Sequence, residues 1–311
     1  MIRLVGVRLL AGVATLLAAS ILIFGVMQLL PGDAATAALK QQAADKKVLA
    51  ELRHEYGLDR PAPVRYARWI GGILHGDFGK APASGLQVTS LIRSPLKNTS
   101  VLLAFTLLLM LPLAIAIGTA SALRRQSWLD GGLQTVVLVF ASLPSFVVGI
   151  VLIVLFAFTW KLLPAVSLTL SARSIVLPVA TLVLGWVPLT ARMVRAGIVD
   201  VLESDYVQMA RLKGMPERKV VRRHVLPNSL VPAIQAFALT AASMPAGIVI
   251  VEYLYSFQGI GNALVQAVEN RDTATVEAVT LILVAVYILA NLVSDIATVL
   301  LTPRLRTQTA G

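Results

Sequence analysis

The chain has 311 residues, of which 57% are hydrophobic and 14% charged, and its mean hydropathy is +0.80. Soluble domains carry about a quarter charged residues, so this composition excludes a soluble globular protein and, because hydrophobicity is high, a disordered chain. The chain has no cysteine, which also excludes a disulfide scaffold and thiolate chemistry. The formal net charge of +11 is typical of nucleic-acid binding in a soluble protein, but here membrane topology must be considered first.

Six stretches are long and apolar enough to cross a bilayer, because about 20 helical residues span about 30 Å of hydrocarbon. The first has basic residues ahead of it and resembles a secretory leader. Its apolar run is too long for a signal core, so we expect a retained anchor. The sequence therefore predicts an all-α membrane protein with six transmembrane helices, at about 9–30, 98–122, 132–157, 175–196, 229–253 and 276–301.

Lys and Arg in the short connections predict the orientation of these spans. With the amino terminus inside, fourteen basic residues lie in inner segments and three in short outer ones; segment 31–97 is long enough to cross regardless of charge. We therefore expect both termini in the cytoplasm and no nucleic-acid partner. The inner residues are Arg3, Arg8, Arg124, Arg125, Arg192, Arg195, Arg211, Lys213, Arg218, Lys219, Arg222, Arg223, Arg304 and Arg306, and the outer ones are Lys161, Arg173 and Arg271.

Segment 31–97 is predicted to be a small helical insertion outside the cytoplasm. Residues 43–56 have apolar positions at helical spacing, and a second short helix is expected from Val64 to Leu74. A segment of this size cannot support a large core, so we expect it to lie on the outer ends of the spans. The predicted organisation is a cytoplasmic amino terminus with the first span (1–30), the extracytoplasmic insertion (31–97), a five-span core (98–301) containing a cytoplasmic loop (197–228), and a cytoplasmic tail (302–311).

The sequence has no complete motif for binding a nucleotide or a catalytic metal ion. No G-x-x-x-x-G-K-[ST] loop for a nucleotide occurs, and Gly259 and Gly261 form only a lone G-x-G. His54 and Glu55 begin a zinc-helix pattern whose second histidine is replaced by Leu58. We therefore predict that the chain is not an enzyme and holds no metal or cofactor of its own.

The cytoplasmic loop carries the signals of two short helices. A cap, an acidic first turn and a basic last turn bound the first helix, and a glycine follows its end. Pro216 and Glu217 then start the second helix. The signals of the first helix are Glu203 or Ser204 as the cap, Asp205, Arg211, Lys213 and Gly214.

Residues Tyr206, Met209 and Ala210 are expected to share one face of the first short helix, because they are three and four residues apart. A helix pair presented between two spans suits docking of another protein. The alternative is an ordinary basic loop that lies on anionic membrane lipid.

At these residues the chain resembles the permeases of binding-protein-dependent ABC importers, of the dipeptide, oligopeptide and nickel class. The family pattern D-Y-V-x-x-A-R-x-K-G followed by R-H-x-L-x-N-x-L-x-P stands here at 205–214 and 223–232. Departures at Pro227, Thr302 and Thr273-Ala274 leave the substrate subgroup open. Further matching pieces, in order along the chain, are 30–33, 56–61, 68–69, 76–79, 142–146, 252–261, 270–272 and 303–306.

This resemblance implies a type I ABC importer permease in a bacterial cytoplasmic (inner) membrane, which imports dipeptides or oligopeptides. It implies a second homologous permease subunit, two ABC ATPase subunits that bind ATP and Mg, and an extracytoplasmic substrate-binding protein. ATP-driven closure of the ATPases would rock the spans between two states. The implied ATPase-docking residues are Glu203, Asp205, Tyr206, Ala210, Arg211, Lys213 and Gly214.

Alternative functions remain open at this point. The same kind of permease could import nickel, glutathione or another small solute. A secondary transporter or channel would show inverted repeats with broken helices, and we find no convincing internal repeat.

Polar residues inside the predicted spans have two interpretations. Tyr287, Asn291 and Asp295 repeat every four residues, so we expect them to face protein and to bond between helices, with a place in the substrate pathway as the alternative. Glu252 is taken as an interfacial residue at the outer end of the fifth span. Weaker pathway candidates are Gln134, Ser142 and Ser145 in the third span, and Gln235, Thr240 and Ser243 in the fifth. Pro112, Pro144, Pro188 and Pro245 are expected within spans whose neighbours satisfy the freed backbone groups.

Overall fold

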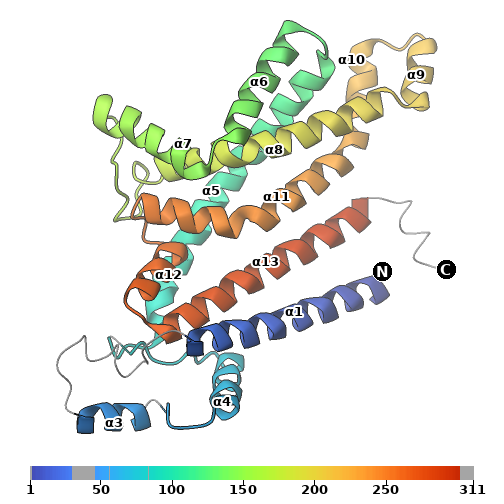
Figure 1. Ribbon diagram of the computed structural model, residues 1–311. Coiled ribbons are helices and arrows are strands. Elements are labelled where there is room, and N and C mark those ends of the chain that lie inside the picture. Colours follow the sequence, from blue (N-terminus) through green and yellow to red (C-terminus); the bar gives the residue numbers. More distant parts are fainter. Residues whose placement is uncertain (1, 30–45, 56, 83, 302–311) are drawn as a thin grey trace.

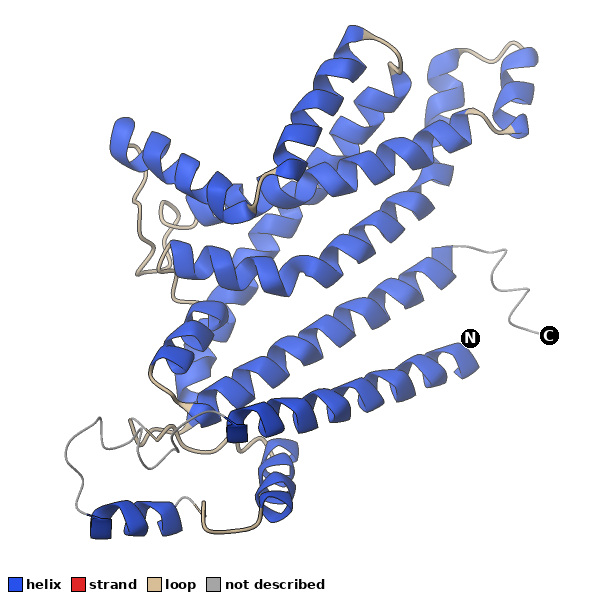
Figure 2. Ribbon diagram, in the orientation of Figure 1, coloured by secondary structure: helices blue, strands red, loops and turns tan. Residues whose placement is uncertain are grey.

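The computed structural model describes residues 2–29, 46–55, 57–82 and 84–301. This part of the chain is helical, with one isolated β-bridge between Lys80 and Gln87. Figures 1 and 2 show long helices that run side by side and short helices at both ends. The long ones are α1 (Ile2–Leu29), α5 (Val88–Leu123), α8 (Val176–Leu202), α11 (Leu226–Leu254) and α13 (Thr273–Leu301); the remainder are α3 (Lys46–Glu55), α4 (Ala62–Leu74), α6 (Trp128–Ser142), α7 (Ser145–Leu152), η1 (Ile153–Thr159), α9 (Asp205–Leu212), α10 (Glu217–Val220), η2 (Val221–Val225) and α12 (Ile260–Glu269).

The predicted membrane fold is confirmed. Judged by length and composition, α1, α5, α8 and α13 each contain a stretch that can cross a membrane, and α6 with α7 and η1 forms a fifth, bent candidate. The 29-residue α11 covers the predicted span 229–253. Helix α5 is 36 residues long and begins ten residues before the predicted second span.

The third predicted span is present as a bent pair of helical segments and not as one continuous helix. Helix α6 ends at Ser142 and α7 begins at Ser145, with an angle of 103° between the two segments, which diverge clearly in Figure 1. Pro144 disfavours a helical conformation of the preceding residue, and Leu143 is extended, with φ −89° and ψ 129°. Pro188, by contrast, is buried inside an unbroken α8.

Helix α8 lies at the centre of the bundle and packs against α5, α11, α6 and α7. Gly118 of α5 allows this close approach, because a Cβ there would lie 2.7 Å from the carbonyl oxygen of Ala191 in α8. The hydroxyls of Thr190 in α8 and Thr240 in α11 are 2.9 Å apart and form a buried hydrogen bond. The core around these helices includes Leu102, Met110, Leu177, Leu182, Ile248, Val251, Tyr255 and Phe257.

The two short helices of the insertion form where the sequence predicts them, at Lys46–Glu55 and Ala62–Leu74. Helix α4 lies against the last turns of α1: the hydroxyls of Ser20 and Tyr66 are 2.8 Å apart, and the rings of Phe24 and Tyr66 have centroids 5.5 Å apart. The opposite end of the bundle carries α9 and α10, the beginning of α1 and the end of α13 (Figure 1). The chain thus places its short helices at two separate ends of one helical bundle.

Candidate functional site

The most distinctive local structure is a helical arm, which we define as residues 203–220. Ser204 stands at the N-cap of α9 in an extended conformation, although its hydroxyl donates to the carbonyl of Val201 at 2.5 Å and makes no cap bond. Gly214 follows the helix with φ +74°, a left-handed conformation that glycine adopts without the steric cost of a Cβ. Both predicted short helices are present, and the glycine turn folds α10 back beside α9.

A bidentate ion pair holds the two helices of the arm together. Arg211 donates from Nη2 and Nε to the two carboxylate oxygens of Glu217, at 2.6 and 3.1 Å. The Arg211 guanidinium lowers the pKa of the Glu217 carboxyl, and Glu217 raises the pKa of Arg211. Planar double contacts of this kind also set the relative orientation of the two groups, so the pair defines the angle between α9 and α10.

The exposed face of α9 differs from the predicted one. Ala210 is only 6% exposed and packs with Val207, Val220 and Ile198 inside the chain, so its expected place on an outward face with Tyr206 and Met209 is wrong. The physical reason is that the arm needs its own small core, and α9 turns its smallest apolar side chains towards α8. The exposed apolar ridge consists of Tyr206 (45% exposed), Met209 (58%) and Leu212 (81%).

The base of the arm is joined to the turn between α5 and α6. Arg125 of this turn forms an ion pair with Glu203, which follows the last residue of α8. Asp205 and Lys213 bound α9 at its first residue and at its C-cap, where the sequence places them. The arm is therefore attached to α8 by the chain itself and to the α5–α6 turn by this ion pair.

Beneath this base lies a polar cluster that sequence analysis missed, formed by Ser121, Asp130, Gln134 and Arg195. Asp130 is buried and accepts hydrogen bonds from Ser121, from Arg195 Nε at 3.0 Å and from Arg195 Nη2 at 2.8 Å. Gln134 donates to Ser121 at 2.9 Å. The cluster joins α5, α6 and α8, so the side chain of Gln134 takes part in a contact between helices.

The signal for this cluster was present in the sequence. Ser127 caps α6 by accepting from the backbone amide of Asp130 at 3.2 Å, and a serine three residues before an acidic residue is a recognisable helix start. The pairing with Arg195 lies 65 positions away in sequence. Only the packing of α8 against α6 reveals it.

The opposite end of the bundle contains a second buried carboxylate, Glu252, and its description as an interfacial residue is wrong. Glu252 is fully buried; its Oε2 accepts from the amides of Gly261 and Asn262 at 2.7 and 3.3 Å, and Thr99 donates to its Oε1 at 2.5 Å. These amides belong to the first turn of α12, whose positive end favours a carboxylate. The site needs glycine at 259, because a Cβ there would collide with Glu252.

The predicted polar face of α13 divides into separate environments. Asp295 forms an ion pair with Arg8 of α1, at 3.2 Å. Tyr287 is exposed in this chain, and Asn291 donates to the backbone carbonyl of Tyr287 in the same helix at 2.8 Å. Only Asp295 therefore makes the expected contact with another helix.

The remaining polar candidates lie around the Pro144 bend or in α11. Ser142 is exposed and donates to the carbonyl of Leu138 at 2.9 Å, while Ser145 starts α7 and is half-buried. Gln235 and Ser243 are in α11, but their side chains lie outside the described residues. Within the described part of the chain, no group of three or more His, Cys, Asp or Glu side chains is arranged to hold a metal ion.

Comparisons with known proteins agree with this architecture. The family described as the binding-protein-dependent transport system inner membrane component matches residues 96–307, and the family of the N-terminal parts of such membrane components matches residues 1–117. A solved structure of an amino acid ABC transporter with histidines has a TM-score of 0.52 at 17% identity, and the match covers 68% of this chain and 94% of that chain. That likeness shows a shared fold.

Two curated relatives are similar over almost the full length. A probable peptide ABC transporter permease protein of Sinorhizobium fredii is 31% identical over 306 residues, which are 96% of this chain and 97% of the relative. The glutathione transport system permease protein GsiC of Salmonella paratyphi A is 34% identical over 299 residues, with the same coverage of both chains.

The fold and the arm define a multi-pass helical membrane protein whose short helical pair projects from one end of its bundle. Within that class, the chain belongs to the inner membrane components of binding-protein-dependent transport systems. Members of this family are membrane permeases rather than ATPases, and membership implies ATPase and substrate-binding partners.

Proposed function

We propose that this chain is the permease subunit of an ATP-driven importer for peptides and forms half of the translocation pathway beside a second homologous permease. The relative from Sinorhizobium fredii, named for peptide transport, supports this substrate class. Glutathione is the second candidate, because the Salmonella relative is named for it and glutathione is itself a small peptide.

The proposed topology has both termini and the loop 197–228 in the cytoplasm, with segment 31–97 outside. The excess of basic residues in the short inner connections supports this orientation. The arm, the beginning of α1 and the end of α13 lie at one end of the bundle (Figure 1), as this topology requires. The five-span core 98–301 then carries the pathway, and 302–311 is a cytoplasmic tail.

The proposed docking site for one ATPase subunit is the arm. Its exposed apolar ridge, held rigid by the Arg211–Glu217 pair, is the observation that carries this proposal, because an isolated ridge at the end of a bundle gains free energy when a partner covers it. Tyr206 and Met209 would contact the partner. Glu203, Asp205, Ala210, Arg211, Lys213 and Gly214 would shape the arm and orient it, and ATP and Mg would be bound by the two ATPase subunits.

Coupling is proposed to run from the arm into the spans. Closure of the ATPases would move α9; the Arg125–Glu203 pair would transfer this motion to the α5–α6 turn, and the cluster around Asp130 would transfer it to α8. Ser142, Ser145 and Gln235 remain our candidates for the pathway.

The experiment is co-purification of the ATPase subunits with the permease, followed by substrate-stimulated ATP hydrolysis in reconstituted vesicles that contain the binding protein. Met209→Glu places a charge on the ridge and should abolish both signals. The matched control is Lys219→Glu on the exposed side of α10, which changes charge without touching the ridge. Wild-type co-purification and hydrolysis in Met209→Glu would contradict docking at the arm.

A further inference from the structure

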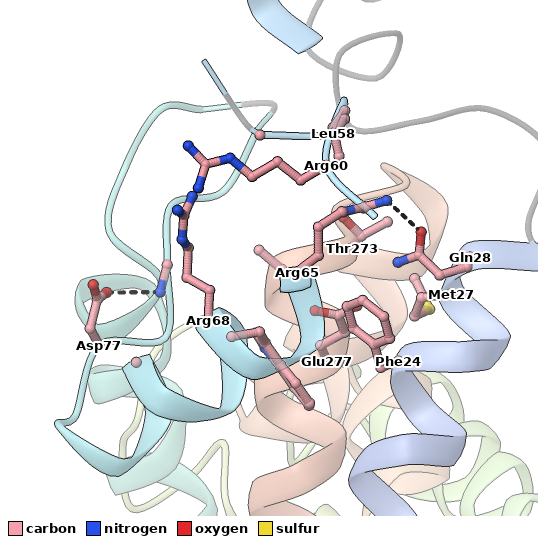
Figure 3. Close-up of a pocket in the computed structure, with 15 residues that line it drawn as sticks. Phe24, Met27, Gln28, Leu58, Arg60, Arg65, Arg68, Asp77, Thr273 and Glu277 are labelled. Atoms are coloured by element: carbon pink, nitrogen blue, oxygen red, sulfur yellow. Dashed lines mark hydrogen bonds between the residues drawn. The ribbon is translucent and has the colours of Figure 1, made fainter. Parts of the chain in front are cut away.

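A cavity of about 480 Å³ lies where the insertion meets the membrane helices, well away from the arm. Figure 3 shows its walls, which come from the end of α1, helix α4, the loops before and after α4, and the beginning of α13. Three arginines from the insertion, Arg60, Arg65 and Arg68, line it. The proposed function uses none of these residues.

Two of these arginines, Arg60 and Arg68, lie close together. Arg60 and Arg68 both approach Gly57: Arg68 Nη1 lies 3.5 Å and Arg60 Nε 3.8 Å from the point where a Cβ of Gly57 would stand. Their guanidinium groups point toward one another in Figure 3. Within the described part of the chain, neither guanidinium forms a hydrogen bond or an ion pair. Two adjacent positive charges repel each other unless an anion lies between them.

The acidic side chains of the described residues near the cavity each interact with another group, and Asp59 also attracts Arg60. Asp77 accepts from the amide of Gly79 at 2.9 Å, and Asp59, beside Arg60 in sequence, is 2.9 Å from His54 Nδ1. Glu277 on α13 is attracted by Arg65, which also donates to Gln28 at 2.9 Å. Of the three arginines, Arg65 is the one that hydrogen-bonds to another described residue, so Arg60 and Arg68 are the two whose guanidinium groups can meet an occupant.

The floor of the cavity contains two polar groups of opposite kind that make no hydrogen bond within the described part of the chain, although Arg65 attracts one of them, Glu277. Glu277 is only 7% exposed and accepts no hydrogen bond from the described residues, and Trp69 Nε1 is buried without an acceptor. Buried polar groups are almost always paired, so an occupant that both donates and accepts fits this floor. A hydroxyl does both, donating to the Glu277 carboxylate and accepting from the Trp69 indole.

The surroundings identify the source of such an occupant. Leu22, Val26 and Leu29 are exposed apolar side chains on the last turns of α1, on the side of the helix away from Phe24, Met27 and Gln28, which line the cavity. Phe24, Tyr66 and Trp69 form an aromatic cluster with ring centroids 5.5 to 6.0 Å apart. Tyr66 and Trp69 belong to α4, which packs on the end of α1, and Tyr and Trp are enriched at the level of lipid headgroups.

We propose that this cavity binds the headgroup of an anionic phospholipid that carries hydroxyl groups, such as phosphatidylglycerol. Its phosphate lies between Arg60 and Arg68, because guanidinium groups bind phosphate oxygens in pairs. The headgroup hydroxyls reach Glu277 and Trp69, and the acyl chains extend from the cavity towards the membrane beside α1. The lipid thereby ties the insertion to α1 and α13.

The test is native mass spectrometry of the purified full-length chain, titrated with phosphatidylglycerol, phosphatidylethanolamine or phosphatidylcholine of identical acyl chains. The wild type should bind phosphatidylglycerol about tenfold more tightly than the other two lipids, because phosphatidylglycerol has a net negative charge and the other two headgroups are zwitterionic. Arg60→Gln with Arg68→Gln should abolish the preference. The control is Arg93→Gln with Lys97→Gln, which removes two exposed positive charges from the beginning of α5. This control should retain the preference for phosphatidylglycerol.

Further arms separate the alternatives. Arg60→Lys with Arg68→Lys keeps both charges and should retain part of the preference, which also guards against a folding defect in the glutamine variant. Equal affinity for all three lipids, or an unchanged preference in the glutamine variant, would overturn the proposal. So would tight binding of glycerol 3-phosphate alone, which would assign the site to a soluble anion. The glutamine variant could also lose the binding protein from the reconstituted complex while keeping its lipid preference. That result would assign the two arginines to an acidic protein partner instead.

Discussion

Arg8 Nε lies 3.2 Å from Asp295 Oδ2, so an ion pair joins the first turns of α1 to the last turns of α13. These two helices lie side by side at the edge of the bundle (Figure 1). The apolar surface of α1 is largely exposed. The pair therefore fixes the register between the beginning and the end of the chain. Because both side chains are partly exposed, its contribution to stability is modest.

Asp295→Asn should lower the free energy of unfolding in detergent by about 1 kcal/mol or less, and should leave substrate preference unchanged. Arg8→Gln should have a similar effect, and the double variant should cost little more than either single one. Thermal unfolding of the purified chain measures all three, and transport by the assembled importer measures preference. Altered preference with normal stability would instead place Asp295 in the pathway.

The buried Glu252 site predicts a clear cost for a small change at Gly261. A Cβ at Gly261 would lie 2.6 Å from Val249 Cα and 3.0 Å from Glu252 Oε2, so Gly261→Ala should destabilise the chain by about 1 to 3 kcal/mol. Glu252→Ala leaves buried amides unpaired and should cost about as much. The control is Gly131→Ala in α6, where a Cβ meets nothing within 4 Å. Equal thermal stability of the Gly261 and Gly131 variants would contradict this description.

Because Ala210 is buried, its substitution tests the stability of the arm and not the contact with a partner. Ala210→Glu forces a charge into the core of the arm, so hydrogen exchange of residues 205–220 should rise in the isolated permease, before any partner is added. Met209→Glu, on the exposed ridge, should leave that exchange unchanged. Gly214→Val should also loosen the arm, because a β-branched residue at φ +74° costs about 1 to 2 kcal/mol. Unchanged exchange in Ala210→Glu would show that α9 does not pack as described.

The Arg211–Glu217 pair predicts a loss of order in the arm at low pH. The pKa of Glu217 is lower in the folded arm than its ordinary value of 4.5, so ionised Glu217 stabilises the arm fully above that value. The contribution falls away as the pH drops through the lowered pKa. Hydrogen exchange of 205–220 should therefore rise between pH 5 and pH 3 relative to the rest of the chain. Arg211→Gln should weaken this dependence; an identical pH profile in that variant would show that the pair does not control it.

The proposed topology is testable because the chain has no cysteine of its own. Single cysteines at Ala50 in α3 and Lys219 in α10 occupy exposed positions at the two ends of the bundle. In intact cells, an impermeant thiol reagent should label position 50 only, and both positions should react after permeabilisation. Labelling of position 219 in intact cells would reverse the orientation.

Sequence by itself determined the features that depend on local composition and spacing. Apolar stretches predict membrane helices because the free energy of transfer from water to lipid is a sum over residues. The order Ser204, Asp205 to Gly214 predicts a short helix because helix caps and left-handed ends act within one turn. The same local rules predicted the helices of the insertion. The effect of each proline could not be predicted from the sequence. The helix breaks at Pro144 and continues through Pro188, and the difference depends on what packs around each proline.

Tertiary structure alone decided which polar residues meet. Asp130 finds Arg195 across 65 positions, and Glu252 finds Thr99 across 153. Periodicity shows which residues share a helix face but not which helix that face meets; Ala210 therefore looked exposed and proved buried, while Glu252 looked interfacial and proved to cap α12. Pairings between distant segments are determined by the packing of whole helices, and their energies are not a sum over neighbouring residues.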